Sequence, residues 1–163
     1  MKLAICPGSF DPVTNGHLQI VSRAAEMFDR VIVVAMANQN KQPLFSAEER
    51  VELLRRATAG MANVEVDTYD GLLVEYARQK QASVIVKGLR AMSDFEYEFQ
   101  MALTNRKLNP DVETVFLATS AEYMYLSSSL VKQVASLGGD IREFVPACLS
   151  KDILEKYGRE ETQ

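Results

Sequence analysis

Residues 2–17 read KLAICPGSFDPVTNGH, and the expected fold follows from this stretch. Its first part, Lys2–Cys6, is a short apolar run that leads into Pro7 and Gly8, which is typical of a buried strand. A loop comes next, and a helix is expected to begin near Thr14. A strand that leads through a loop into a helix is the first half of a βαβ unit.

The same alternation continues along the chain. Short runs rich in β-branched residues predict further strands at Val31–Met36, Val64–Val66, Val84–Val86 and Val112–Leu117. The stretches between them have apolar residues at helical spacing. Two of these stretches open on a serine with a glutamate three residues later, the spacing of a capping box, at Ser46 and Ser93. Such a chain predicts an α/β, Rossmann-like, doubly wound domain with a five-stranded parallel sheet.

A helical extension is expected after the last strand. Residues 127–129 are three serines, and an amphipathic helix follows them until Gly138 and Gly139 end it. A last short helix is expected over about Ala147–Tyr157. The whole chain, residues 1–163, is interpreted as one nucleotide-handling domain, and its polar tail 158–163 is expected to fray.

Composition excludes several classes. Of 163 residues, 47% are hydrophobic and 25% are charged, with a net charge of −4. The acidic balance argues against a nucleic-acid partner, and the absence of a long apolar run argues against a membrane one. Cys6 and Cys148 lie far apart and have no metal-ligand spacing. They are expected to be reduced thiols in a cytoplasmic protein.

The loop after the first strand has the features of an anion site. Gly8 allows close approach, Ser9 offers a hydroxyl, and Gly16 leaves room at the helix end beside His17, the single histidine of the chain. The spacing matches neither a dinucleotide fingerprint nor a P-loop. A histidine that only makes a local hydrogen bond at the helix start explains the residue equally well, so both interpretations stay open here.

Gly8–Pro12 followed by Thr14–His17 resembles the signature of the nucleotidyltransferase superfamily with an H/T-x-G-H motif. The version with threonine most resembles the bacterial phosphopantetheine adenylyltransferase family. Residues 87–90, KGLR, and 94–98, DFEYE, resemble two further motifs of that family, as does the serine run. The resemblance spans essentially the whole chain. It implies that His17 is a catalytic residue that stabilises the transition state at the α-phosphate of ATP.

The resemblance also implies two sets of binding residues. The acceptor substrate would contact Ser9, Lys41, Leu73 and Lys87. ATP would contact Ser9, Phe10, His17, Gly88, Leu89, Arg90, Glu98, Tyr123, Met124, Tyr125, Leu126, Ser127, Ser128 and Ser129. Within the serine run, Ser128 and Ser129 are the preferred phosphate donors. Without the resemblance, each set has a plainer explanation as solvated surface charges, a core leucine and helix-capping serines.

The implied activity is adenylyl transfer from ATP to 4′-phosphopantetheine, which gives dephospho-coenzyme A and pyrophosphate in coenzyme A biosynthesis. Coenzyme A itself is a further expected ligand. Mg²⁺ is expected as the cofactor, held by the ATP phosphates, with no metal ligand from the protein. Two alternatives stay open. One is a superfamily member that uses nicotinate mononucleotide or a phospho-alcohol with CTP. The other is a non-catalytic nucleotide-binding module.

The helix expected after Ser93 is apolar on two sides. Phe95 and Phe99 lie on one side, and Tyr97 and Met101 lie on nearly the opposite side, together with Leu108. The first side is expected to face the sheet. The second is expected to be covered by another subunit or by the C-terminal helix of the same chain. The family resemblance implies a homo-oligomer, a hexamer.

Overall fold

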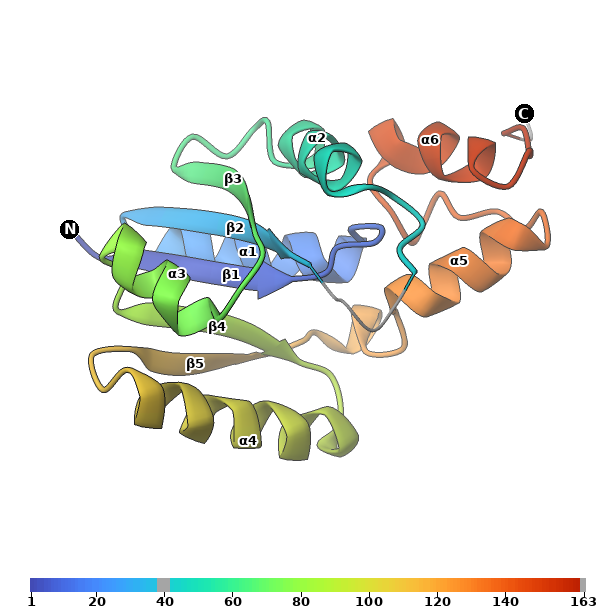
Figure 1. Cartoon of the computed structure of the whole chain (residues 1–163). Coiled ribbons are helices and arrows are strands. Elements are labelled where there is room, and N and C mark those ends of the chain that lie inside the picture. The colour runs from blue at the N-terminus through green and yellow to red at the C-terminus, as the bar shows by residue number, and fades with distance from the viewer. Residues whose placement is uncertain (38–41, 162–163) are drawn as a thin grey trace.

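The computed structural model describes residues 1–37 and 42–161. Its centre is a parallel sheet of five strands in the order β3-β2-β1-β4-β5 (Figure 1). The strands are β1 (Leu3–Gly8), β2 (Arg30–Met36), β3 (Val64–Tyr69), β4 (Val84–Leu89) and β5 (Glu113–Ala118). The predicted doubly wound, five-stranded parallel sheet is confirmed. β3 and β4 each run three residues further than the apolar pattern predicts, because the sheet pairs their polar ends as well.

Six α-helices connect and extend the sheet. They are α1 (Asn15–Met27), α2 (Ala47–Ala57), α3 (Leu73–Lys80), α4 (Met92–Leu108), α5 (Ser128–Ser136) and α6 (Ser150–Glu155). In Figure 1, α1 lies behind the sheet and α3 in front of it, while α5 and α6 lie beyond the arrowheads of the strands. The C-terminal helical extension is thus confirmed, and it stands where the carboxyl ends of the strands point.

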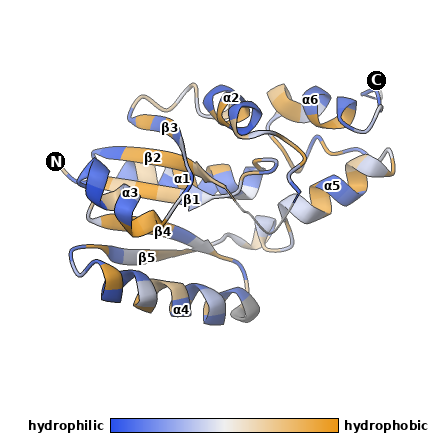
Figure 2. Cartoon of the chain, in the orientation of Figure 1, coloured by the Kyte–Doolittle hydropathy of each residue, from blue (hydrophilic) through white to orange (hydrophobic). Residues whose placement is uncertain are grey.

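Alternate residues of the strands face the two sides of the sheet. Leu3 and Ile5 of β1 pack toward α3, in one buried cluster with Tyr76. Ala4 and Cys6 of the same strand belong to the larger cluster on the other side. Strands buried on both faces are continuously apolar, as the orange ribbons of β1 and β2 show in Figure 2. Each fully buried Val, Leu or Ile side chain stabilises the fold by about 1.5–3 kcal/mol.

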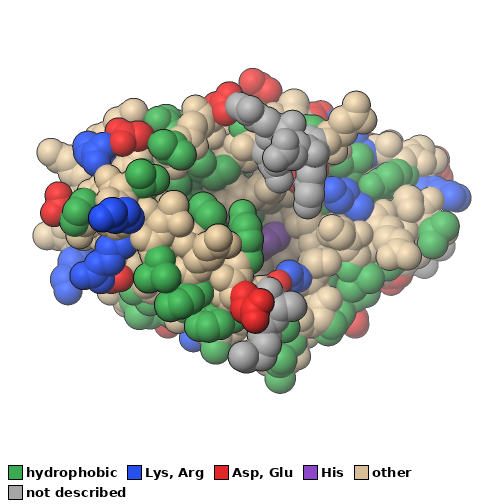
Figure 3. All heavy atoms as spheres, turned by 60° about the horizontal axis from the view of Figure 1, so that its bottom comes forward, with side chains coloured by type: hydrophobic (Ala, Val, Ile, Leu, Met, Phe, Trp, Pro, Cys, Tyr) green, Lys and Arg blue, Asp and Glu red, His purple; other side chains and the backbone are tan. Residues whose placement is uncertain are grey.

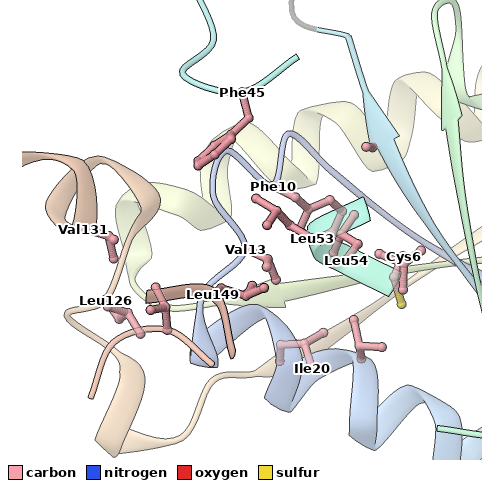
Figure 4. Close-up of a cluster of buried hydrophobic side chains, with 14 of the residues drawn as sticks. Cys6, Phe10, Val13, Ile20, Phe45, Leu53, Leu54, Leu126, Val131 and Leu149 are labelled. Atoms are coloured by element: carbon pink, nitrogen blue, oxygen red, sulfur yellow. The ribbon is translucent and has the colours of Figure 1, made fainter. Parts of the chain in front are cut away.

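The larger cluster also joins the C-terminal extension to the sheet. Phe10 and Val13, which follow β1, pack in it with Leu126, Val131 and Leu149 from the last third of the chain (Figure 4). The loop after β1 is therefore held from both sides by apolar contacts.

β1 and β4 separate toward their carboxyl ends. β1 pairs with β2 over six residues, but it pairs with β4 only through Ala4 with Val84 and Ile5 with Ile85. The sheet order reverses between these strands, and such a switch point leaves a crevice at the carboxyl edge. The described part of the chain builds its candidate site there.

Of the three helix starts predicted near Thr14, Ser46 and Ser93, the first two are confirmed. Thr14 caps α1, and Ser46 caps α2 in a capping box with Glu49. The predicted capping box at Ser93 is wrong, because α4 begins earlier, at Met92, with Ala91 as its N-cap and no side-chain cap hydrogen bond. Among the described residues, no helix is long and apolar enough to cross a bilayer.

Gly88 lies where the sheet approaches α1 closely. A Cβ atom at this position would lie 2.8 Å from Cγ1 of Ile20, a buried α1 side chain. We expect Gly88→Ala to lower the free energy of unfolding by about 1–3 kcal/mol, because the overpacked side chain must shift. Urea unfolding followed by circular dichroism measures this loss. Gly60→Ala, at a position with nothing within 4 Å, is the control and is expected to change stability little. Equal stability of the two variants would contradict the expectation.

Candidate functional site

A cavity of about 350 Å³ lies at the crevice between β1 and β4. Figure 3 shows the histidine, in purple, at the floor of a hollow in this face. Twelve of the residues assigned from the sequence line this cavity: Ser9, Phe10, His17, Lys87, Gly88, Arg90, Glu98, Tyr123, Leu126, Ser127, Ser128 and Ser129. They come from four separate segments, which only the folded chain brings together.

Four assigned residues that the structure describes are not among the lining residues. Leu89, Met124 and Tyr125 are neighbours of lining residues but do not line the cavity, and the Tyr125 ring packs edge-on against another aromatic ring. Leu73 is the first residue of α3 and packs with the smaller core cluster. Lys41 lies outside the described residues.

His17 is the third residue of α1 and forms a reciprocal cap with Thr14. The Thr14 N–H donates to Nδ1 of the imidazole at 3.0 Å, and the His17 N–H donates to the Thr14 hydroxyl oxygen at 3.3 Å. A capping box normally places glutamate or glutamine here. His17 therefore makes the local hydrogen bond expected of a histidine at a helix start, and its ring lines the cavity as well. The two interpretations of this histidine are compatible.

The imidazole is held in its neutral form. Burial, together with the positive charges of Arg90 and Lys87, lowers the pKa of His17 from 6.5 to about 4, and burial contributes most. Because Nδ1 accepts the Thr14 N–H, the single proton of the neutral ring belongs on Nε2. His17 thus presents one N–H donor, of fixed tautomer, for a ligand in the cavity.

The ring of Phe10 holds the imidazole from the other side. Its centroid lies 5.1 Å from that of His17 in an edge-to-face arrangement. Phe10 adopts a left-handed backbone with φ of 50°, which costs about 1–3 kcal/mol in a residue with a side chain. A Cβ atom at Gly8 would lie 3.0 Å from this ring. The space left by Gly8 therefore accommodates the Phe10 ring, and Gly8 also lines the cavity.

Two cations of the cavity have acidic partners. Lys87 Nζ lies 3.3 Å from Glu98 Oε1, and Arg90 Nε donates to Asp94 Oδ2 at 3.1 Å. A second nitrogen of Arg90 donates to the Leu126 carbonyl at 2.7 Å. These contacts limit where each long side chain can point. Glu98, which the family resemblance assigns to ATP binding, forms an ion pair with Lys87. Asp94 received no role, although its i,i+4 spacing from Arg90 indicates the pair.

The serine run begins α5 at the cavity. Ser127 caps the helix by accepting the Leu130 N–H at 3.1 Å, as expected. The Ser128 hydroxyl donates to the Pro12 carbonyl at 2.7 Å. The prediction that this hydroxyl is spare is thus wrong, because its one proton is already used. The run still brings a helix N-terminus to the cavity, and with α1 two positive helix ends face it.

Cys6 also lines the cavity, although its position in the sequence did not indicate this. Burial raises the pKa of its thiol to about 12, against a smaller opposite effect of Lys87. The thiol is therefore neutral and serves as an apolar surface. Cys6 and Cys148 are both free, as expected.

A more open groove of about 500 Å³ lies between α2 and α6, away from these residues. Ion pairs between Arg56 and Asp152 and between Lys156 and Glu49 cross it. These pairs join the two helices, so the groove is a helix–helix contact, whereas the crevice at β1 and β4 gathers the anion-binding groups.

The protonation state of His17 gives a direct prediction. Since the chain has one histidine, its imidazole nitrogens are identified without ambiguity in a long-range ¹H–¹⁵N spectrum. We expect a neutral ring with the proton on Nε2 from pH 8 down to about pH 5, and titration near 4. The folded pKa lies below the unfolded one, so the unfolded chain takes up the proton first. The contribution of His17 to the free energy of unfolding is therefore full above about pH 6.5, and it declines as the pH falls toward 4. Titration near 6.5 would contradict this account.

Known proteins resemble the chain closely. The model of the family described as cytidylyltransferase-like matches residues 5–134. A protein of Caldanaerobacter subterraneus subsp. tengcongensis named phosphopantetheine adenylyltransferase is 59% identical over 96% of this chain and 98% of its own. A protein of the same name from Alkaliphilus metalliredigens is 58% identical over 96% of this chain and 99% of its own.

Solved structures show the same fold at low identity. A putative nicotinate-nucleotide adenylyltransferase of Vibrio parahaemolyticus has a TM-score of 0.70 and 18% identity over 94% of this chain and 99% of its own. The nicotinic acid mononucleotide adenylyltransferase of Plasmodium falciparum, complexed with NaAD, has a TM-score of 0.69 and 13% identity over 96% of each chain. The family model and the two sequence relatives, each of which matches 96% of the chain, show that the chain belongs to the phosphopantetheine adenylyltransferase family of nucleotidyltransferases.

Proposed function

We propose that this chain transfers the adenylyl group of ATP to the phosphate of 4′-phosphopantetheine and releases pyrophosphate and dephospho-coenzyme A. The observation that supports it is one cavity in which a neutral imidazole donor, two cations and two helix N-termini meet. Such a cavity suits two phosphorylated molecules, and the relatives named above have this activity in their names.

The chemistry needs positioning more than acid–base catalysis. The acceptor phosphate is an anion at neutral pH, so it attacks the α-phosphorus without losing a proton. The bond from that phosphorus to the bridging oxygen breaks, and pyrophosphate leaves with the electron pair. Negative charge on the transferring group increases on the way. Preorganised donors stabilise it most when they need no rearrangement. In this proposal the Nε2–H of His17 and the guanidinium of Arg90 act as these donors, and Lys87 meets the acceptor.

Magnesium enters this proposal as part of the ATP substrate. The carboxylates that line the cavity, Asp94 and Glu98, are both paired with cations. The triphosphate oxygens are then the ligands that suit Mg²⁺, which keeps several waters and binds phosphates readily. The site would receive the metal and the nucleotide together.

The proposed reaction is tested by pyrophosphate release from the purified protein. We expect release with ATP and 4′-phosphopantetheine, none with nicotinate mononucleotide as acceptor, and little with CTP in place of ATP. The assay includes nicotinate mononucleotide because the solved structures of similar fold are named as adenylyltransferases of that nucleotide. ATP binding without turnover of any acceptor would instead indicate a nucleotide-binding module.

Loss of the imidazole should reduce turnover sharply. We expect His17→Ala to lower kcat about 100-fold or more, because a preorganised donor to the transition state is removed. His17→Gln is the matched variant, since its terminal amide can place an N–H near the position of Nε2 and recover part of the rate. Circular dichroism checks that both variants are folded. A near-normal rate for His17→Ala would reject the role.

We also propose that the chain forms a homo-oligomer through α4, and a hexamer in particular. Tyr97, Leu103 and Leu108 are 63%, 55% and 49% exposed, and Phe99 is 47% exposed although it stacks on Phe95. The alternative that the C-terminal helix covers this face is wrong, because these side chains are open to solvent. The Phe95 ring meets a β5 ring edge-on, so only that side faces the sheet, and incompletely. Apolar faces of this kind mark interfaces.

Sedimentation velocity tests the assembly. We expect the wild-type chain to sediment as a hexamer at micromolar concentration, and Leu103→Glu to sediment as smaller species because a charge is placed on the apolar face. Leu137→Glu, at a still more exposed leucine that ends α5, is the control and should leave the assembly intact. A monomeric wild-type chain would refute the proposal.

The cytoplasm is the proposed location. Both cysteines are free, and one of them is exposed. Exposed thiols persist in a reducing compartment.

A further inference from the structure

We propose that Arg50 and Asp11 are positioning residues that brace the phosphate loop, residues 9–12, against both ends of the β2–α2 connection. The brace presets the loop for ATP, so its loss should lower kcat more than it weakens ATP binding. The inference rests on the proposed function of the same cavity. Neither residue lines that cavity, and both are buried, with 5% and 7% of their surface exposed.

Arg50 joins the ends of two neighbouring strands. It is on α2, and one guanidinium nitrogen, Nη1, donates to the Ser9 carbonyl at 2.8 Å and to the Met36 carbonyl at 3.1 Å. Nε donates to the Ser46 carbonyl at 3.4 Å. Ser9 follows β1, and Met36 is the last residue of β2. Gly8 and Ala35 make the last pair between these strands, so the guanidinium supplies the next link where the ladder stops.

The Arg50 bond sets the direction of a peptide group in the phosphate loop. The Ser9 carbonyl belongs to the same planar peptide as the Phe10 N–H, and in a trans peptide these two groups point in opposite directions. A carbonyl held toward Arg50 therefore turns the Phe10 N–H away from α2. Ser9 and Phe10 line the cavity. The brace thus controls a backbone donor of the loop that the resemblance assigns to ATP.

Asp11 holds the other end of the connection. Its two carboxylate oxygens accept the N–H groups of Leu44 and Phe45, each at 2.8 Å. Lys132 of α5 lies 3.4 Å from Oδ2. Arg50 therefore ties the loop to the residue that ends β2, and Asp11 ties it to the residues that precede the cap of α2. Two adjacent anchors of opposite charge oppose both translation and rotation of the loop.

The type of residue at position 50 supports a positioning role. A buried guanidinium loses hydration, and an apolar side chain of similar volume often gives equal or better stability in such places. Arg50 instead donates hydrogen bonds to backbone carbonyls at the edge of the site. The left-handed Phe10 and its contact with His17 follow directly after Ser9, so a shift of the Ser9 carbonyl would be felt at the imidazole.

The test compares Arg50→Met, which keeps the length but removes the donors, with Arg50→Lys, which keeps the charge but has a single donor nitrogen on a shorter side chain. Arg55→Met is the control, since Arg55 is exposed on the same helix. Wild-type turnover with ATP and 4′-phosphopantetheine is measured first. We expect Arg50→Met to lower kcat about 10–100-fold, because small misplacements are costly in the transition state. KM for ATP should change less than about 3-fold, and Arg50→Lys should lie between.

A readout without catalysis accompanies the kinetics. In ¹H–¹⁵N spectra of the free protein, the Phe10 amide should shift strongly in Arg50→Met and stay unchanged in Arg55→Met. Asp11→Asn, which keeps one acceptor oxygen, gives the same two measurements if Arg50→Met does not fold, and it should also lower kcat more than it raises KM.

Two results would overturn the inference: an unchanged kcat in a folded Arg50→Met or Asp11→Asn variant, or an unshifted Phe10 amide. Failure of the proposed function is distinguishable, because it shows as absent turnover in the wild-type chain while the amide shift is still observed.

Discussion

The hydrogen bond from the Thr14 N–H to Nδ1 of His17 is the contact on which the proposed chemistry of this cavity depends. It uses one ring nitrogen to cap α1 and thereby directs the remaining proton to the other nitrogen. Burial and the two nearby cations keep that ring neutral. A charged imidazole would repel Lys87 and Arg90, whereas a neutral one adds a donor without adding charge. The helix cap and the functional donor are therefore one feature of the structure.

Charge is arranged locally in a chain that is acidic overall. The net charge is −4, yet Lys87 and Arg90 face the cavity with two helix N-termini. Glu98 and Asp94 hold the two cations in place in the free protein. An incoming polyanion can compete for these cations without moving the backbone that carries them. The same local neutralisation limits repulsion between cations that lie side by side in a partly buried space.

The sequence predicted the architecture well, because apolar runs and helical spacing report directly on burial. It placed the five strands, the first two helix caps and the C-terminal extension. It was wrong at Ser93, because a serine and a glutamate at capping distance also occur inside a helix, here α4, which begins at Met92. It was wrong about the Ser128 hydroxyl, because its acceptor, the Pro12 carbonyl, lies 116 residues away in the chain. The Phe10 ring beside Gly8 was not predicted, because its position depends on an unusual backbone angle.

By itself, the sequence determined the order of elements, the two-sided burial of the sheet and the motifs that belong to the family. These follow from local pattern, since period and composition act over a few residues. Only the tertiary structure decided which motif residues share the cavity, which hydroxyl is already bonded, and which acid restrains which cation. It alone placed Arg50 and Asp11 behind the phosphate loop. Such contacts join segments far apart in the chain, and their geometry exists only after the strands and helices have packed.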